Sequence, residues 1–236
     1  MTGDMEVTTE KKWLGEQRAK IAISNLNKRN INAQYVASRQ EALNAILEMI
    51  PHGATVARGD SITIDQIGVI PELTRRQQNA IIDPFQWDAD GYYIDTAEDR
   101  WQMYREAFFA DIFLSGINAV TMDGKLVNVD GLGNRVAATI FGPEKVILAA
   151  GINKIVRDVD EAMERIRQVA APINARRHYL RHHCDELADL PCVRTGRCVD
   201  CNHEWRICCF TVIIDGTARS EKDRINVVLV GEELGI

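Results

Sequence analysis

Aromatic residues are scarce in this sequence. They make up 6% of its 236 residues, whereas hydrophobic residues make up 46% and charged residues 26%. Proteins that bind single-stranded nucleic acid stack the bases on aromatic side chains, so this composition argues against such a surface. A basic excess is also missing, because the formal net charge is -6, and this disfavours binding to a phosphate backbone. We therefore expect no nucleic-acid partner.

Long apolar runs are absent as well. The run nearest to a membrane span, VILAAGINKIV, is interrupted by Asn153 and Lys154 and falls well short of the roughly 20 apolar residues that a spanning helix needs. The first residues, MTGDMEVTTEKKWLGEQ, contain no apolar segment of the kind found in an export signal. We therefore expect a cytoplasmic protein without a membrane span.

Short extended segments alternate with segments of helical periodicity along the chain. This alternation is typical of an α/β fold with a mostly parallel sheet and flanking helices, and we expect one such domain over residues 1–236. Helices are predicted at residues 11–30, 38–50, 97–110, 134–140 and 158–170, and strands at 32–37, 53–59, 111–120, 124–129, 145–151, 210–215 and 224–236. Residues 71–95 are expected to form an irregular surface loop held by its aromatic side chains.

Polar residues follow the predicted strand in VARGDSITID, residues 56–65. Ser61 and Thr63 come just before or within the start of a helix, where hydroxyl groups and unpaired backbone N–H groups can bind an anion. Ligands of open α/β sheets bind at the carboxyl edge of the strands, which is where this turn would lie. The alternative is that Asp60 or Ser61 only caps the helix.

A second polar stretch, NAVTMDGKLVNVDGLGNRVAA, covers residues 118–138. Its DGLGNR turn can direct successive N–H groups at an anion while Arg135 supplies charge, although it lacks the third glycine of a dinucleotide fingerprint. Lys154 follows a third strand and would reach the same edge. Asp130 is the candidate catalytic acid or base, unless it only makes local hydrogen bonds. The predicted ligand-binding residues are Ser61, Thr63, Asn118, Asn128, Gly131, Gly133, Asn134, Arg135 and Lys154.

Five of the six cysteines fall in the segment PCVRTGRCVDCNHEWRICC. The spacing of Cys192, Cys198, Cys201 and Cys208 suits four thiolate ligands, so we expect a metal-binding insertion at about residues 184–209. A 4Fe-4S cluster is the first expectation, because a zinc ribbon normally has two C-x-x-C pairs and this segment has one; Zn is the alternative. Free cysteines in a packed loop remain another possibility, whereas a reducing compartment disfavours disulfides.

Four segments together resemble the LUD-domain family of lactate-utilization proteins, with this chain as a stand-alone, cysteine-containing member. They are RGDSIT, NVDGLGNRVAATIFGPEKVILAAGINKIV, AAPINARR and PCVRTGRCVDC. The resemblance runs in order from about Trp13 to Gly235. It implies a fold similar to the ribose-5-phosphate isomerase and CoA-transferase superfamily. Asp60 is a departure, because relatives tend to have a glycine-rich turn there, and its charge would repel an anion.

The resemblance also implies a role in organic-acid metabolism. The leading hypothesis is a protein that binds a small organic anion and a metal centre, and that takes part in lactate or organic-acid oxidation and electron transfer with iron-sulfur or redox partners. One alternative is an isomerase or transferase acting on a phosphorylated or acyl substrate, with a purely structural metal. Another is a non-catalytic regulatory subunit, and a homo-oligomer is compatible with each hypothesis.

Overall fold

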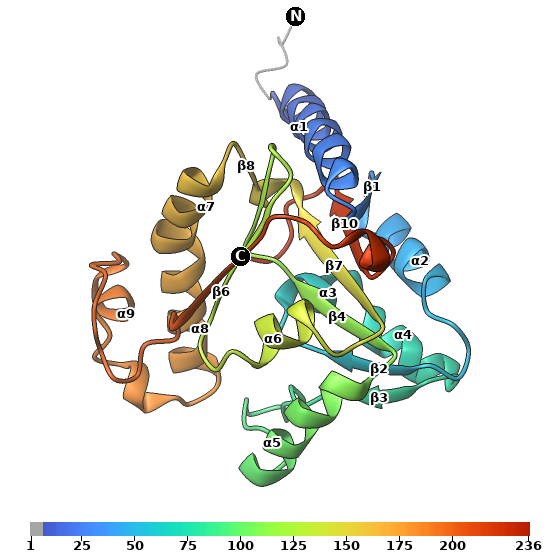
Figure 1. Ribbon diagram of the computed structural model, residues 1–236. Helices are drawn as coiled ribbons and strands as arrows, with labels where there is room; N and C mark the ends of the chain where they lie inside the picture. Colours follow the sequence, from blue (N-terminus) through green and yellow to red (C-terminus); the bar gives the residue numbers. More distant parts are fainter. Residues whose placement is uncertain (1–6) are drawn as a thin grey trace, which may run out of the picture.

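Two β-sheets form the centre of the protein, whose computed structural model describes residues 7–236 (Figure 1). The first is parallel throughout, with the strand order β1-β10-β7-β4-β2-β3. The second has the order β8-β5-β6-β9 and is mixed. The strands are β1 (Asn32–Val36), β2 (Thr55–Arg58), β3 (Ala80–Ile82), β4 (Ile112–Gly116), β5 (Ala119–Thr121), β6 (Leu126–Asp130), β7 (Lys145–Gly151), β8 (Ile155–Val156), β9 (Phe210–Ile214) and β10 (Ile225–Val230).

Helices surround both sheets and connect most of the parallel strands (Figure 1). They are α1 (Thr8–Lys28), α2 (Arg39–Glu48), α3 (Ile62–Ile67), α4 (Val69–Arg76), α5 (Ala97–Glu106), α6 (Asn134–Ile140), α7 (Val159–Arg165), α8 (Ala171–Arg181) and α9 (Pro191–Thr195). Single helical turns lie at Ala107–Phe109, Ile152–Lys154, Ile166–Ala170, Asp185–Leu187 and Arg219–Glu221. The predicted α/β fold, with a mostly parallel sheet and flanking helices, is confirmed.

The six-stranded sheet is buried on both faces, which explains its continuous apolar strands. Along β7, Val146, Leu148 and Ala150 pack in one core with α1 and α6, whereas Ile147 and Ala149 pack in a second core with α2, α3 and α4. Successive side chains of a strand point to opposite faces, so an apolar run without alternation is required here. With both faces covered, the polar turns that follow the strands lie at the edge of the sheet.

The second sheet is also covered on two sides. Its residues Val120 and Leu126 join the core that contains α1, while Ala119 and Val127 pack against α7. A π-helical turn, Ile166–Ala170, joins α7 directly to α8, with Pro172 in the first turn of α8. Figure 1 shows α7 and α8 beside this sheet, with α9 beyond them.

Predicted helix starts agree with the structure. The hydroxyl of Ser38 accepts a hydrogen bond from the Glu41 N–H, and that of Thr96 accepts one from the Asp99 N–H. Side-chain caps of this type satisfy N–H groups that have no partner within the helix. No helix within residues 7–236 combines the length and apolar character that would let it cross a membrane.

Two segment predictions need correction. Residues 71–95 are not wholly irregular, because they contain the end of α4 and the edge strand β3. The predicted strand at 111–120 is two strands, β4 and β5, which belong to different sheets and are separated by Ile117 and Asn118. A continuous apolar pattern does not reveal where a chain passes from one sheet to another.

The turn between β5 and β6 provides a stability prediction. Gly124 has φ 90°, and a Cβ there would lie 2.6 Å from the backbone carbon of Asn25 in α1. We expect Gly124→Ala to lower the free energy of unfolding by about 2 kcal/mol or more, because left-handed strain alone costs about 1–2 kcal/mol. Gly53→Ala is the matched control, since Gly53 has φ 83° and open space around it. Equal losses for the two variants in urea unfolding would contradict the predicted contact with α1.

Candidate functional site

A cavity of about 590 Å³ lies at the carboxyl edge of the six-stranded sheet. Residues that follow β2, β4, β7 and β10 all line it, including Ser61, Ile117, Lys154 and Gly235. The three polar turns singled out in the sequence therefore meet in one place. Of the residues predicted to act in the site, the cavity is lined by Ser61, Thr63, Asn118, Asp130, Gly131, Asn134, Arg135 and Lys154, but not by Asn128 or Gly133.

The turn after β2 has a structural role in addition to lining the cavity. Ser61 is the N-cap of α3, and its hydroxyl accepts a hydrogen bond from the Ile64 N–H at 3.2 Å. Thr63 is 1% exposed, and its hydroxyl oxygen accepts a hydrogen bond from Lys154 Nζ at 2.9 Å. The helix-cap reading of Ser61 is thus correct, while Thr63 holds the lysine in place.

Lys154 is the most unusual side chain of the cavity. It ends the single helical turn after β7 and is only 4% exposed. Within residues 7–236 it forms no ion pair, and its one hydrogen-bond partner is a neutral hydroxyl. Burial, together with the positive charges of Arg165 and Arg135, lowers the pKa of its ammonium group to about 7.

Arg135 holds the polar loops together. Its guanidinium donates to Asn128 Oδ1 at 2.7 Å and to the Val129 carbonyl at 2.8 Å. Asn128 Oδ1 also accepts from the Asn118 N–H, and Asn118 Oδ1 accepts from the Val129 N–H. Most of the N–H donors of Arg135 are therefore used in hydrogen bonds within the protein. These contacts are structural, and Arg135 contributes its positive charge to the cavity.

The DGLGNR turn is organised around Asp130. The Asp130 carboxylate lies 3.8 Å from Arg135 Nε and accepts a hydrogen bond from the Val136 N–H at 3.3 Å. The Asp130 carbonyl accepts from the Cys209 N–H and so ties the cysteine segment to this turn. Gly133 is the left-handed N-cap of α6, outside the cavity lining, whereas Gly131 and Asn134 line the cavity. These contacts support the local hydrogen-bonding alternative for Asp130, and its catalytic role stays a prediction.

Helix α8 adds a cluster that the sequence reasoning missed. Arg177 donates to Asp60 Oδ2, and His178 Nε2 lies 3.3 Å from the same oxygen. Burial alone would raise the Asp60 pKa, but the hydrogen bond to His178 and the charge of Arg177 hold this pKa well below 3.8. The negative charge of Asp60 is therefore compensated by Arg177 and His178, which weakens the expected repulsion of an anion. The basic run ARRHYLRHH was the signal in the sequence that could have revealed these partners.

Aromatic side chains close another side of the cavity. Phe85, Tyr93 and Tyr104 line it, and burial raises the pKa of the Tyr104 hydroxyl to about 12. Behind them, Trp87 stacks on His182 with the ring centroids 4.3 Å apart, and burial lowers the pKa of His182 to about 4. These contacts fix residues 83–95 against the end of α8, as the predicted aromatic packing of this loop requires.

The four cysteines of the predicted ligand set line one small cavity. This cavity measures about 100 Å³ and is lined by Cys192, Cys198, Cys201 and Cys208, whereas Cys184 and Cys209 line the larger cavity. All six cysteines are free. Leu187, Leu190 and Val193 form a small apolar core beneath the segment. The four cysteines that were chosen by their spacing in the sequence thus lie around the same cavity.

The chemistry of these thiols suits a cationic group. Burial raises the pKa of Cys192 and Cys208, and negative charge on Cys201 and Cys198 raises it further, so a nearby cation is needed to stabilise four thiolates together. No three His, Cys, Asp or Glu side chains of residues 7–236 converge on a point as a single ion would require. Four cysteines are the ligand set of both structural zinc sites and 4Fe-4S clusters, so the expected metal centre stays a prediction.

The two cavities share a wall. Val129, Ile166, Ala171, Arg206 and Ile207 line both of them. Arg206 is fixed by a hydrogen bond from its guanidinium to the Cys201 carbonyl at 3.1 Å. The cysteine segment is therefore not a separate appendage, because it forms one side of the cavity at the sheet edge.

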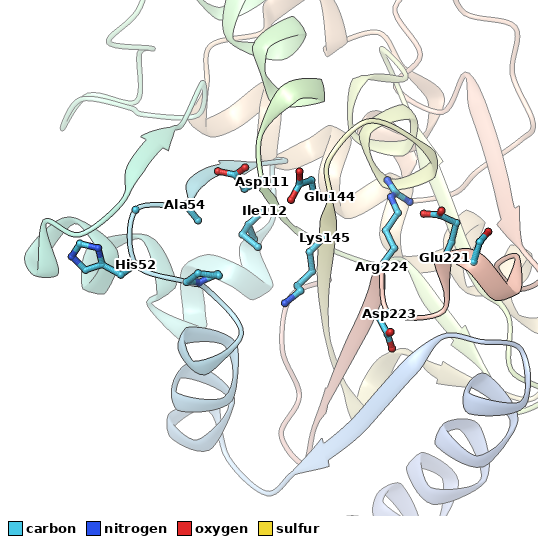
Figure 2. A pocket seen from close by; sticks show the side chains of 12 residues that line it. His52, Ala54, Asp111, Ile112, Glu144, Lys145, Glu221, Asp223 and Arg224 are labelled. Carbon is cyan, nitrogen blue, oxygen red and sulfur yellow. The ribbon is translucent and has the colours of Figure 1, made fainter.

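Another hollow, of about 600 Å³, lies at the opposite, amino edge of the sheet (Figure 2). Figure 2 shows charged side chains from several segments around it, and three of them bond to other parts of the fold. Lys145 Nζ donates to the Met49 carbonyl, Arg224 donates to carbonyls at the end of α6, and Asp111 accepts from the Thr55 N–H. These contacts are structural. Lys145, which begins β7, is a matched control for Lys154.

Comparisons with known proteins identify the family of the chain. A DUF162 family protein from Deinococcus radiodurans, known from a crystal structure, is 16% identical in sequence, with a TM-score of 0.46 and coverage of 94% of this chain and 98% of that chain. No curated protein matches the chain. The LUD domain family matches residues 19–230, from α1 to the last strand of the central sheet. The chain therefore belongs to the LUD domain family.

Proposed function

We propose that the chain binds a small organic anion in the larger cavity and a 4Fe-4S cluster in the adjacent cysteine cavity, and acts in the oxidation of organic acids. The LUD domain family is associated generally with lactate utilization, which places a hydroxycarboxylate among the first ligands to examine. The observation that carries the proposal is the shared wall between the two cavities, formed in part by Arg206 and Ile207.

Charge supports an anionic ligand. Lys154 and Arg135 bring positive charge to the cavity, while Arg177 and His178 compensate the charge of Asp60. A buried cation without an acidic partner is costly, and a bound carboxylate would remove that cost. The aromatic wall leaves part of the cavity apolar, which suits an organic rather than an inorganic anion.

The cysteine set supports the cluster. Cys192, Cys198, Cys201 and Cys208 would be its four ligands, and soft thiolates are the ligands that iron-sulfur clusters prefer. When bound, a 4Fe-4S cluster would supply a one-electron donor or acceptor beside the ligand cavity. Residues of this chain form the wall between the cluster and the ligand cavity. One of them, Arg206, is held in place by its hydrogen bond to the Cys201 carbonyl.

Ligand-induced stabilisation tests the anion site. At a concentration about 100 times its Kd, a ligand raises the free energy of unfolding by about 2.7 kcal/mol. For a protein of this size that corresponds to a Tm increase of about 5–10 °C. We expect such a shift with L-lactate or pyruvate, and we expect Lys154→Met to abolish it, because the buried positive charge is lost.

Lys145→Met is the matched control, since Lys145 begins the strand that Lys154 follows and lies at the opposite sheet edge (Figure 2). It should leave the ligand shift intact. A shift that is equal in both variants would place the anion site elsewhere. A shift produced equally by inorganic phosphate would contradict a preference for organic anions.

A further inference from the structure

Lys154 has a geometry that anion binding alone does not require. Its amine is buried in the cavity wall and is held from one side by the Thr63 hydroxyl at 2.9 Å. Within the described residues, no carboxylate forms an ion pair with it. A lysine that served only as a fixed positive charge would be stabilised by an acidic partner or by solvent, and this one has neither.

The environment of Lys154 makes its neutral amine far more accessible than that of an ordinary lysine. The charged side chains around it are Arg135 from α6 and Arg165 from α7, and both repel its positive charge. Arg165 is itself fixed between loops, because it donates to the carbonyls of Asn153 and Asn118. Lysines that react with carbonyl compounds are activated by desolvation and by a neighbouring cation, and both conditions are met here.

We propose that Lys154 is a carbonyl-reactive lysine that forms an imine with a small oxo-carboxylate bound in the larger cavity. Nζ attacks the carbonyl carbon, the carbonyl oxygen leaves as water with the two amine protons, and a carbon–nitrogen double bond joins the ligand to Lys154. Arg135 and Arg165 supply the positive field that attracts the carboxylate of the same ligand. This inference rests on the proposed anion site and adds the chemical class of its ligand.

Close contacts around Nζ keep the amine in one position. A Cβ on Gly235 would lie 2.6 Å from Lys154 Nζ and 2.3 Å from the Thr63 hydroxyl oxygen. The Gly235 N–H donates to Gln66 Oε1, and the Leu234 N–H donates to Asn153 Oδ1, so the backbone of residues 234–235 is fixed beside the amine. A reacting carbonyl must therefore approach Lys154 from the cavity.

Reductive trapping tests the proposal on the unmodified protein. Pyruvate and sodium cyanoborohydride are added at pH 7, hydride reduces any imine to a stable secondary amine, and peptide mass mapping locates the adduct. With its pKa at about 7, about half of the Lys154 amines are neutral at this pH, against roughly one in 2,500 for an ordinary lysine. We expect the adduct predominantly on Lys154, and we expect Lys154→Arg to remove it while Lys145→Arg retains it.

Two further measurements separate this inference from the proposed function. Acetone, which has a carbonyl group but no carboxylate, should label Lys154 far more slowly than pyruvate. L-lactate, which cannot form an imine, should slow pyruvate labelling by competition. Labelling spread evenly over surface lysines would overturn the inference, even where anions still raise the Tm. Labelling of Lys154 without any stabilisation by L-lactate would instead count against the hydroxycarboxylate part of the proposed function.

Discussion

Replacement of Cys198 by serine is expected to remove the metal centre from the purified protein. Cys198 lines the small cavity with Cys192, Cys201 and Cys208, so the variant leaves three thiolates for a cluster that takes four. Changes to groups that only support metal ligands already cost about 10–100-fold in affinity, and loss of a ligand should cost more. We expect bound iron to fall by at least about tenfold, together with the visible absorbance that bleaches on reduction in anaerobically prepared protein.

Cys184→Ser and Cys209→Ser are the controls. Both residues line the larger cavity and neither lines the small one, so both variants should keep their iron and their absorbance. Loss of iron from a control variant would contradict the assigned ligand set. A colourless parent protein with stoichiometric zinc would contradict the cluster and favour the structural-metal alternative.

Loss of the ion pair between Asp60 and Arg177 should destabilise the protein strongly. The two side chains are 18% and 11% exposed, and Asp60 Oδ1 is buried without a hydrogen-bond partner within the described residues. Removing one member of such a pair leaves a buried charge and costs about 3–5 kcal/mol. We expect Asp60→Asn and Arg177→Met each to lower the free energy of unfolding by about 3 kcal/mol in urea titrations.

The double variant separates the pair from its surroundings. Because the two residues are in direct contact, the combined loss should be smaller than the sum by about 0.5–3 kcal/mol. Simple additivity would show that the contact contributes little. Arg75→Met is a matched control, since Arg75 pairs with Glu72 on the exposed surface of α4 and should cost under about 1 kcal/mol.

Acid should weaken the contribution of the Asp60–Arg177 ion pair to stability. The folded-state pKa of Asp60 lies below its ordinary 3.8, so protons bind more readily to the unfolded chain. The contribution is therefore complete at pH values well above 3.8 and is lost as the pH falls below that value towards the folded-state pKa. The stability difference between parent and Asp60→Asn should shrink below about pH 4.

Much of the fold could be predicted because its signals are local. Capping residues such as Ser38 and Thr96 mark helix starts within four residues, and the uninterrupted apolar run of β7 indicates burial on two faces. The assignment of strands to two sheets could not be predicted. The assignment depends on which distant strands pair, and the two residues between β4 and β5 carry no signal for it.

The candidate site shows the same limit. Parallel strands end at one edge, so the meeting of Ser61, Asn118 and Lys154 follows from strand order alone. The partners of Asp60 come from α8, more than a hundred residues away, and depend on how that helix packs against the second sheet. Arg135 was expected to supply free positive charge, but it is engaged in the fold by Asn128 and Val129, because the turn between them folds its side chain back onto β6.

The place of β10 has a consequence for synthesis of the protein. This strand lies between β1 and β7. The edge strand β1 is therefore paired with the rest of the sheet only through residues 225–230. While the ribosome is still adding these residues, β1 has no partner and β7 exposes an apolar edge. The nascent chain must therefore pass through an incomplete state with unpaired strand edges, and the sheet can close only once residues 225–230 have been made.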